Sequence, residues 1–204
     1  MNHRLIAAAL MMLACWLVWP APPGQAAVNP TASPQDRTIA ECTEAITANP
    51  NDYVSYNRRG RAYLDKGLID EAIADYSKAI ELKPDYAAAY FSRGWASQTR
   101  KKWDAAIEDY TQSIKFDPSY WAYNNRAGCN IQKEQYDLAI ADATKAIELN
   151  PKRPNSYFHL AHAYTKKHQY EDAIAAYRAL IANCTDPKDI ERAKESIRTL
   201  GGSA

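Results

Sequence analysis

Hydrophobic residues between positions 34 and 200 recur with the spacing of amphipathic helices. Four segments carry isoleucines seven positions apart, which places both on the same helix face after two turns. These pairs are Ile73 and Ile80, Ile107 and Ile114, Ile140 and Ile147, and Ile174 and Ile181. No segment alternates polar and apolar residues as a half-buried strand would. The pattern predicts an all-α fold of short helices joined by short loops.

Prolines interrupt this pattern at nearly equal intervals. Pro50, Pro84, Pro118 and Pro151 are 34, 34 and 33 residues apart, and each follows a near-copy of the same apolar phrase. Proline fixes φ and cannot continue a helix, so each one marks a helix end. A fixed period of this length indicates an array of repeats, in which each helix pair buries its apolar face against the next pair.

The recurring residues resemble those of the tetratricopeptide repeat. Each repeat is counted from the third residue after the preceding proline, and the third repeat has one residue fewer in its entry turn. The family carries an aromatic residue at position 4, small residues at positions 8, 20 and 27, and an aromatic residue at position 24. These places hold Tyr56, Gly60, Ala72, Ala79 and Tyr76 in the first repeat; Tyr90, Gly94, Ala106, Ser113 and Tyr110 in the second; Tyr123, Ala127, Ala139, Ala146 and Ala143 in the third; and Tyr157, Ala161, Ala173, Leu180 and Tyr177 in the fourth. The resemblance implies a right-handed α-solenoid of antiparallel helix pairs, with small residues where helices cross closely.

The same pattern predicts how the chain is divided. The segment before the first full repeat matches only the second helix of a pair and is therefore a half repeat. The last helix is amphipathic, so it can cover the open face of the final repeat. The predicted segments are a leader at 27–33, a half repeat at 34–50, four repeats at 53–86, 87–119, 120–153 and 154–187, and a capping helix at 188–200.

Residues 1–26 have the order of a secretory signal peptide. A basic start with Arg4 precedes an uncharged run at 5–19 and a proline-rich segment that ends on small residues. A membrane-spanning helix needs about 20 apolar residues, so the run is short. We expect cleavage near Ala26 and a periplasmic or secreted protein, with an uncleaved membrane anchor as the alternative. Lipidation of Cys15 is disfavoured because the apolar run continues beyond it.

Charge limits the classes of partner. Removing residues 1–26 takes away one cation and no acid, which leaves acidic and basic residues in equal number. Sequence-independent nucleic-acid binding requires a basic surplus, so we expect no nucleic acid. The first helices are basic and the second helices acidic, which would favour a partner with acidic residues. Alternatively, these charges pair with one another, basic first helices with acidic second helices. We expect such pairing for Arg59, Arg93 and Arg126, which recur at position 7.

Few residues point to chemistry. The sequence has no glycine-rich phosphate loop, His-Glu-x-x-His, Cys-x-x-Cys or Gly-x-Ser-x-Gly motif. His159 and His162 are three apart on one predicted helix, but no carboxylate or cysteine in that helix completes a metal site. Cys42, Cys129 and Cys184 fall in different repeats, too far apart to pair. We therefore expect free thiols, no enzyme activity, no cofactor and no metal.

Binding is expected on the concave face, which the first helices line in the family. The scaffold does not require the aromatic residues that this chain carries there, and exposed aromatic groups mark interaction sites. The predicted partner-binding residues are Asn57, Arg61, Phe91, Trp95, Trp121, Asn124, Phe158 and His162. The alternative is that these rings pack on neighbouring helices or on the leader. The two-carboxylate clamp of some family members is absent, since its lysines are missing here.

The sequence thus predicts a non-catalytic scaffold or adaptor that binds a partner protein or peptide in a concave groove. We expect a monomer or weak homodimer that contacts a membrane only if the signal segment is retained. One alternative is a self-assembling structural protein that pairs through solenoid ends or through Cys184. Another is a small-ligand carrier or enzyme accessory, which would need a closed pocket with convergent polar groups.

Overall fold

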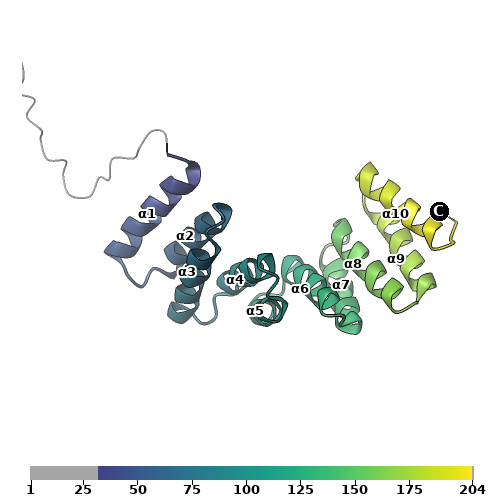
Figure 1. The fold of residues 1–204 in the computed structure, drawn as a ribbon, viewed down its shortest axis with the longest axis horizontal. Coiled ribbons are helices and arrows are strands. Elements are labelled where there is room, and N and C mark those ends of the chain that lie inside the picture. Colours follow the sequence, from purple (N-terminus) through teal and green to yellow (C-terminus); the bar gives the residue numbers. More distant parts are fainter. Residues whose placement is uncertain (1–31, 204) are drawn as a thin grey trace, which may run out of the picture. The chain divides into compact units, whose positions relative to one another are not determined.

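A computed structural model describes residues 32–203, so the predicted signal peptide lies outside the described residues. This part of the chain contains ten α-helices and no strand (Figure 1). The helices are α1 (Pro34–Ala48), α2 (Tyr53–Asp65), α3 (Ile69–Leu82), α4 (Ala87–Thr99), α5 (Trp103–Phe116), α6 (Tyr120–Gln132), α7 (Tyr136–Leu149), α8 (Pro154–Lys166), α9 (Tyr170–Asn183) and α10 (Pro187–Thr199). The predicted all-α fold of consecutive antiparallel helix pairs is confirmed. None of these helices is long and apolar enough to span a membrane.

The helices pair in chain order. Helices α2 and α3, α4 and α5, α6 and α7, and α8 and α9 form four hairpins, while α1 packs on α2 and α10 packs on α9. The first helices of successive hairpins also contact one another, α2 with α4, α4 with α6 and α6 with α8. This places the first helices on the inner side of the curved row in Figure 1. Helix α10 begins at Pro187, at the boundary between the predicted fourth repeat and the predicted capping helix.

Turns inside the hairpins share one backbone requirement. The residue after the C-cap of each first helix adopts a positive φ, +78° at Gly67, +57° at Lys101, +58° at Glu134 and +60° at His168. This left-handed conformation reverses the chain, and its amide closes the turn by donating to a carbonyl of the preceding helix, as Gly67 does to Leu64. The hairpin geometry therefore repeats even where glycine does not.

The tightest packing joins the two helices of a hairpin. Tyr76 of α3 is fully buried against Gly60 of α2, where a Cβ would lie 2.8 Å from the tyrosine ring. Gly94 and Tyr110 repeat this contact, with a corresponding distance of 3.0 Å. The glycine thus makes room for the ring, as expected for a close helix crossing.

Arginines at position 7 pair between the two layers, as the sequence predicted, and each also reaches a third helix. Arg126 of α6 donates from Nε and Nη2 to Asp142 of α7 at 2.9 and 2.7 Å, and from Nη1 to Thr111 of α5 at 2.8 Å. Asn130 also donates to Asp142, which is only 5% exposed. The same bridge joins Arg59 to Asp75 and Thr43, and Arg93 to Asp109 and Ser77.

A second set of ion pairs links successive hairpins at the surface. A cation at the end of each first helix contacts an aspartate in the first turn of the preceding second helix. The pairs are Lys66 with Asp36, Arg100 with Asp70, Lys133 with Asp104, and Lys167 with Asp137. Much of the charge difference between the layers is therefore used in pairing within the array.

The described cysteines are buried free thiols, as expected. Cys42 and Cys129 are 1% and 0% exposed, and burial raises the pKa of Cys129 to about 12. Cys184 is 6% exposed, and its thiol donates to the Lys152 carbonyl oxygen at 3.5 Å. This placement does not favour an intermolecular disulfide at Cys184, because its sulfur lies inside the repeat.

We predict opposite effects for alanine at two helical glycines. Gly60→Ala should lower the free energy of unfolding by about 1–2 kcal/mol, because its Cβ would collide with the Tyr76 ring. Gly128→Ala should raise it by about 1 kcal/mol through helix propensity, since its Cβ would meet only ordinary contacts at 3.5 Å. Urea unfolding of the two variants measures the difference. Equal stability of the two variants would contradict the packing assigned to Gly60.

The two kinds of ion pair should also differ in energy. Asp142→Ala should destabilise the protein by about 3 kcal/mol, because it leaves Arg126 and Asn130 without their shared acceptor in the interior. Asp104→Ala, which removes an exposed pair with Lys133, should change stability little. Urea unfolding again provides the measurement. A similar loss in both variants would show that burial does not set the energy of these pairs.

Candidate functional site

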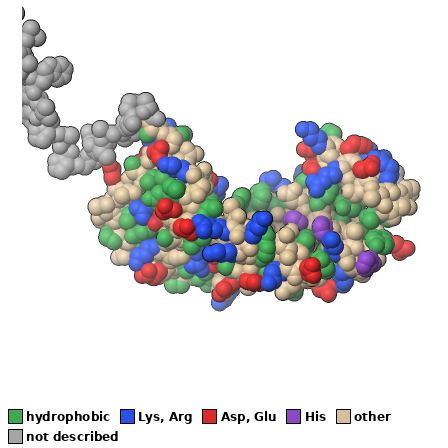
Figure 2. Space-filling model, in the orientation of Figure 1, with side chains coloured by type: hydrophobic (Ala, Val, Ile, Leu, Met, Phe, Trp, Pro, Cys, Tyr) green, Lys and Arg blue, Asp and Glu red, His purple; other side chains and the backbone are tan. Residues whose placement is uncertain are grey.

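The inner face of the array forms a hollow in the surface. Helices α2, α4, α6 and α8 line it, and Figure 2 shows histidine and basic side chains on its wall near the C-terminal helices. The eight predicted site residues all lie on these four helices. They divide into an aromatic centre, a pocket at each end of the groove, and one interior position.

Two tryptophans dominate the centre. Trp95 of α4 and Trp121 of α6 are 43% and 46% exposed. Phe91 is half-buried beneath Trp95, and the centroids of the two rings are 6.0 Å apart. On its other side Phe91 contacts the buried ring of Tyr110, with a centroid distance of 5.7 Å. Phe91 therefore supports Trp95 from the core side. Within residues 32–203, neither indole is buried against neighbouring helices.

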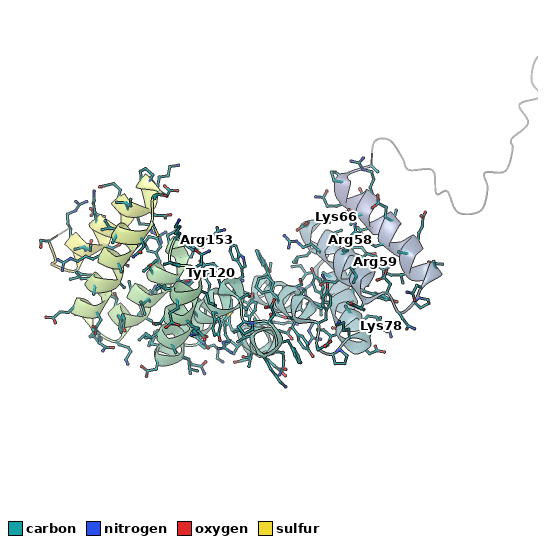
Figure 3. All side chains as sticks on the ribbon, turned by 180° about the vertical axis from the view of Figure 1, so that it is seen from behind. Arg58, Arg59, Lys66, Lys78, Tyr120 and Arg153 are labelled. Atoms are coloured by element: carbon teal, nitrogen blue, oxygen red, sulfur yellow. The ribbon has the colours of Figure 1, made fainter. Side chains whose placement is uncertain are left out.

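An arginine covers one face of each exposed indole. The Arg61 guanidinium lies 5.8 Å from the ring centroid of Trp95, and that of Arg153 lies 4.8 Å from the centroid of Trp121. Arg153, at the start of α8, lies beside Tyr120, which makes an edge contact with Trp121 (Figure 3). Cation–π contacts at exposed sites contribute about 0.5–1 kcal/mol each. They favour these indole orientations in the absence of a partner.

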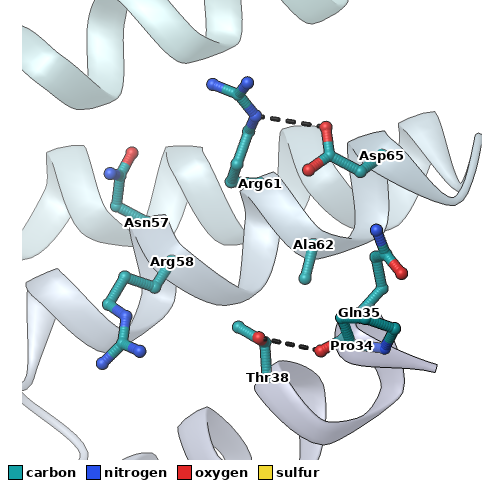
Figure 4. A pocket seen from close by; sticks show the side chains of 8 residues that line it. All are labelled: Pro34, Gln35, Thr38, Asn57, Arg58, Arg61, Ala62 and Asp65. Carbon is teal, nitrogen blue, oxygen red and sulfur yellow. Dashed lines mark hydrogen bonds and ion pairs between the residues drawn. The ribbon is translucent and has the colours of Figure 1, made fainter. Parts of the chain in front are cut away.

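A pocket of about 360 Å³ lies at the N-terminal end, between α1 and α2 (Figure 4). Asn57 and Arg61 line it together with Arg58, and the Oδ1 atom of Asn57 is buried without a hydrogen-bond donor among the described residues. Arg61 donates to Asp65 at 3.2 Å, an exposed pair within α2. The remaining lining comes from Pro34, Gln35, Thr38, Ala62 and Asp65.

A second pocket, of about 370 Å³, lies at the C-terminal end. Phe158 and His162 line it, as does His159 between them in the sequence. Phe158 contacts Tyr177 of α9, and the two ring centroids are 5.9 Å apart. The guanidinium carbon of Arg192 from α10 lies 3.9 Å from the centroid of the Phe158 ring. The other lining residues are Gly128, Ile131, Gln132 and Asn155.

Burial controls the protonation of the two histidines. It lowers the pKa of His159 from 6.5 to about 4, with a smaller contribution from His162. Burial and then the charge of Lys166 also lower the pKa of His162. Both imidazoles are therefore neutral at pH 7, each with one N–H donor. No group of three potential metal ligands lies together in the described residues.

Asn124 does not lie on the groove surface. It is 5% exposed, and its Oδ1 accepts from the Ser156 hydroxyl of α8 at 2.9 Å. Its Nδ2 donates to Asn125 Oδ1 at 3.2 Å. Asn124 thus joins α6 to α8 inside the array, and its predicted contact with a partner does not fit this position.

Sequence reasoning missed several groove residues. Arg192 belongs to the capping helix, which was expected only to cover the open face of the last repeat, and Arg153 precedes the first turn of α8. One signal was available for the C-terminal pocket. Gly128 stands at position 9, where the other repeats carry Arg61, Trp95 and His162, so a gap on the inner face could have been predicted there.

Family models agree with this architecture. Models described as "TPR repeat" or "Tetratricopeptide repeat" match residues 41–74, 60–98, 87–120, 120–153 and 143–175, a continuous stretch from 41 to 175. The chain contains tetratricopeptide repeats. Tetratricopeptide repeats generally act as scaffolds that bind protein or peptide partners rather than as catalysts, and their stacked helices offer extended concave surfaces.

Relatives at the sequence level match only through part of their length. Tetratricopeptide repeat protein 28 of Homo sapiens is 39% identical over 69 residues, which is 34% of this chain and 3% of that protein. Serine/threonine-protein phosphatase T of Aspergillus oryzae is 41% identical over 58 residues, 28% of this chain and 12% of the enzyme. The matched segment thus spans a small fraction of either relative.

Solved structures share the fold over most of the chain. YrrB, described as a TPR protein with an unusual peptide-binding site, superposes with a TM-score of 0.69 at 19% identity, over 79% of this chain and 84% of its own. MamA from Desulfovibrio magneticus RS-1 gives a TM-score of 0.67 at 18% identity, over 79% and 88%. At these identities the likeness concerns the fold alone.

We predict that His159 makes stability depend on pH. Its pKa is about 4 in the folded protein and 6.5 when exposed, so the unfolded chain binds more protons between these values. The free energy of unfolding should therefore fall as the pH is lowered from about 6.5 to about 4. Urea unfolding across this range should show a smaller fall for His159→Gln than for the wild type. An NMR titration that places the His159 midpoint above pH 6 would contradict the assignment.

Proposed function

We propose that the protein is a non-catalytic adaptor that binds an extended or helical segment of a partner protein in the groove of its repeat array. The observation that carries this proposal is the pair of tryptophans on the inner face. Neither belongs to the recurring scaffold, both are nearly half exposed, and aromatic residues of this kind provide most of the binding energy at interfaces.

The groove is held in shape before binding, which favours recognition. Trp95 rests on Phe91 and Arg61, and Trp121 rests on Tyr120 and Arg153. A preorganised surface loses less conformational entropy when a partner binds. YrrB, which shares the fold, is described as having a peptide-binding site, and a peptide segment is the class of ligand proposed here.

The proposed site differs in part from the set expected from sequence. Asn57, Arg61, Phe91, Trp95, Trp121, Phe158 and His162 remain in it, while Asn124 is replaced by Arg153, which covers Trp121. We assign Trp95 and Trp121 the apolar contacts. Asn57 and Arg61 would bind polar groups of the partner, because both side chains line the pocket at the N-terminal end of the groove.

The adaptor is proposed to act in the bacterial envelope. The support is the order of basic, apolar and small residues in residues 1–26, which is typical of an export signal. Partners would then be periplasmic or membrane-attached proteins with segments exposed to the same compartment.

Peptide display on the immobilised protein tests the groove. Peptides selected by the wild type should bind Trp95→Ala and Trp121→Ala at least about tenfold more weakly, because each change removes an aromatic contact surface. Phe116→Ala is the matched control. It removes a comparably exposed ring, 39% against 43%, from the second helix α5.

Titration calorimetry of the selected peptides gives the affinities. Selected peptides that bind both tryptophan variants as tightly as the wild type would overturn the site. A selection that enriches no peptide would overturn the proposed function itself.

A further inference from the structure

The C-terminal pocket owes its existence to a missing side chain. Gly128 of α6 occupies position 9, whose counterparts on the other first helices are Arg61, Trp95 and His162. The ring of His159 approaches the vacated space, since a Cβ on Gly128 would lie 3.5 Å from its Cε1 and Nε2 atoms. The result is a hollow of about 370 Å³, here called the Gly128 pocket, at the end of the groove.

The charge in the Gly128 pocket is unbalanced. No aspartate or glutamate lines it, whereas Arg192 does. Arg192 has no carboxylate within ion-pair distance anywhere in residues 32–203. Arg126 of the position-7 bridges and Lys133 of the surface ion pairs are by contrast paired with aspartates. Arg192 is thus a cation on the groove that the fold does not neutralise.

Stacking on Phe158 favours one position for the exposed Arg192 side chain. Its guanidinium carbon lies 3.9 Å from the ring centroid of Phe158, which is close for a cation–π contact. Stacking uses the face of the guanidinium and leaves its N–H groups at the edge free to donate. Arg192 comes from α10, whose Ala193 and Ile197 are buried, so the helix that carries it is anchored.

The other polar side chains of the pocket, His159, His162, Gln132 and Asn155, are uncharged, and each can donate as well as accept a hydrogen bond. His159 and His162 are neutral at pH 7 because their pKa values are lowered, and each offers one N–H. Gln132 adds an amide that can donate. One positive charge surrounded by neutral donors matches a single negative charge, whereas a phosphate dianion is typically bound by several cations. The apolar sides of Ile131 and Tyr177 suit a methylene chain.

We propose that the Gly128 pocket binds an acidic side chain, a glutamate or aspartate of the partner segment, with Arg192 as its counter-ion. Helix α10 is then part of the binding site as well as the cap of the array. The proposal rests on the proposed function, because it assigns one contact of a partner that lies in the same groove. It also gives the partner an acidic residue at the end of the segment nearest α10.

A small probe tests the pocket directly. N-acetylglutamate N-methylamide carries the predicted carboxylate, and N-acetylglutamine N-methylamide has the same shape without the charge. NMR of the purified protein should show saturable shifts of the His159 and His162 imidazole signals with the first probe, at an affinity at least about tenfold above that for the second.

Two variants remove the pocket by different means. Arg192→Gln should lower the affinity for the glutamate probe at least about tenfold, because it removes the counter-ion. Gly128→Leu should abolish binding of the probe, because the leucine side chain would fill the pocket. Arg198→Gln is the matched control, since Arg198 lies on the same helix and pairs with the exposed Glu195 at 2.7 Å. This control should bind the glutamate probe as the wild type does.

The outcomes separate this inference from the groove function. Equal binding of both probes, no shift with the glutamate probe, or full binding by Arg192→Gln would overturn the inference. Display-selected peptides should carry an acidic residue and lose affinity in Arg192→Gln. If they depend on Trp95 and Trp121 but not on Arg192, the groove function stands and the pocket assignment is wrong. If the glutamate probe behaves as predicted but no peptide is selected, the pocket chemistry stands and the groove function is wrong.

Discussion

The distance between the two helices of a hairpin is the constraint on which the rest of the array depends. In the first two repeats a tyrosine ring fills this interface, and the facing residue must be glycine because a Cβ would lie within about 3 Å of the ring. The third repeat changes both sides of the contact. Ala143 replaces the ring and Ala127 replaces the glycine, and both are fully buried. In these three repeats the helices stay close because the two sides change together. The fourth repeat keeps a ring, Tyr177, with Ala161 in place of the glycine, and this ring is only half-buried and contacts Phe158.

The arginine bridges follow the same rule of joint change. In the first three repeats a position-7 arginine joins an aspartate of its own hairpin to a hydroxyl of the preceding one, which ties three helices. In the fourth repeat Leu160 and Ala176 occupy the two charged places, and both pack in an apolar cluster that includes Leu200 next to α10. An apolar pair avoids the desolvation cost of a buried ion pair. The polar bridge is thus lost at the end of the array, where an apolar contact with the cap replaces it.

The sequence was sufficient for the scaffold because each repeat confirms the others. The period, the position of Gly60 under Tyr76 and the arginine bridges are all local patterns that recur. The site was predicted less well because it depends on residues that do not recur. Asn124 has the position of a groove residue, yet Ser156 on the next hairpin draws its side chain inward. Arg192 enters the site from outside the repeats, so no alignment of repeat positions could place it.

The terminal helix links the stability of the array to its binding surface. In a repeat array each hairpin is stabilised by its neighbours, so the last hairpin depends on its cap. Helix α10 provides that cap through Ala193 and Ile197, and the same helix extends Arg192 over Phe158 into the Gly128 pocket. A ligand that binds Arg192 binds only the state in which α10 is docked, and therefore stabilises the C-terminal end of the array. The groove and the cap are thus energetically coupled, because one helix contributes to both.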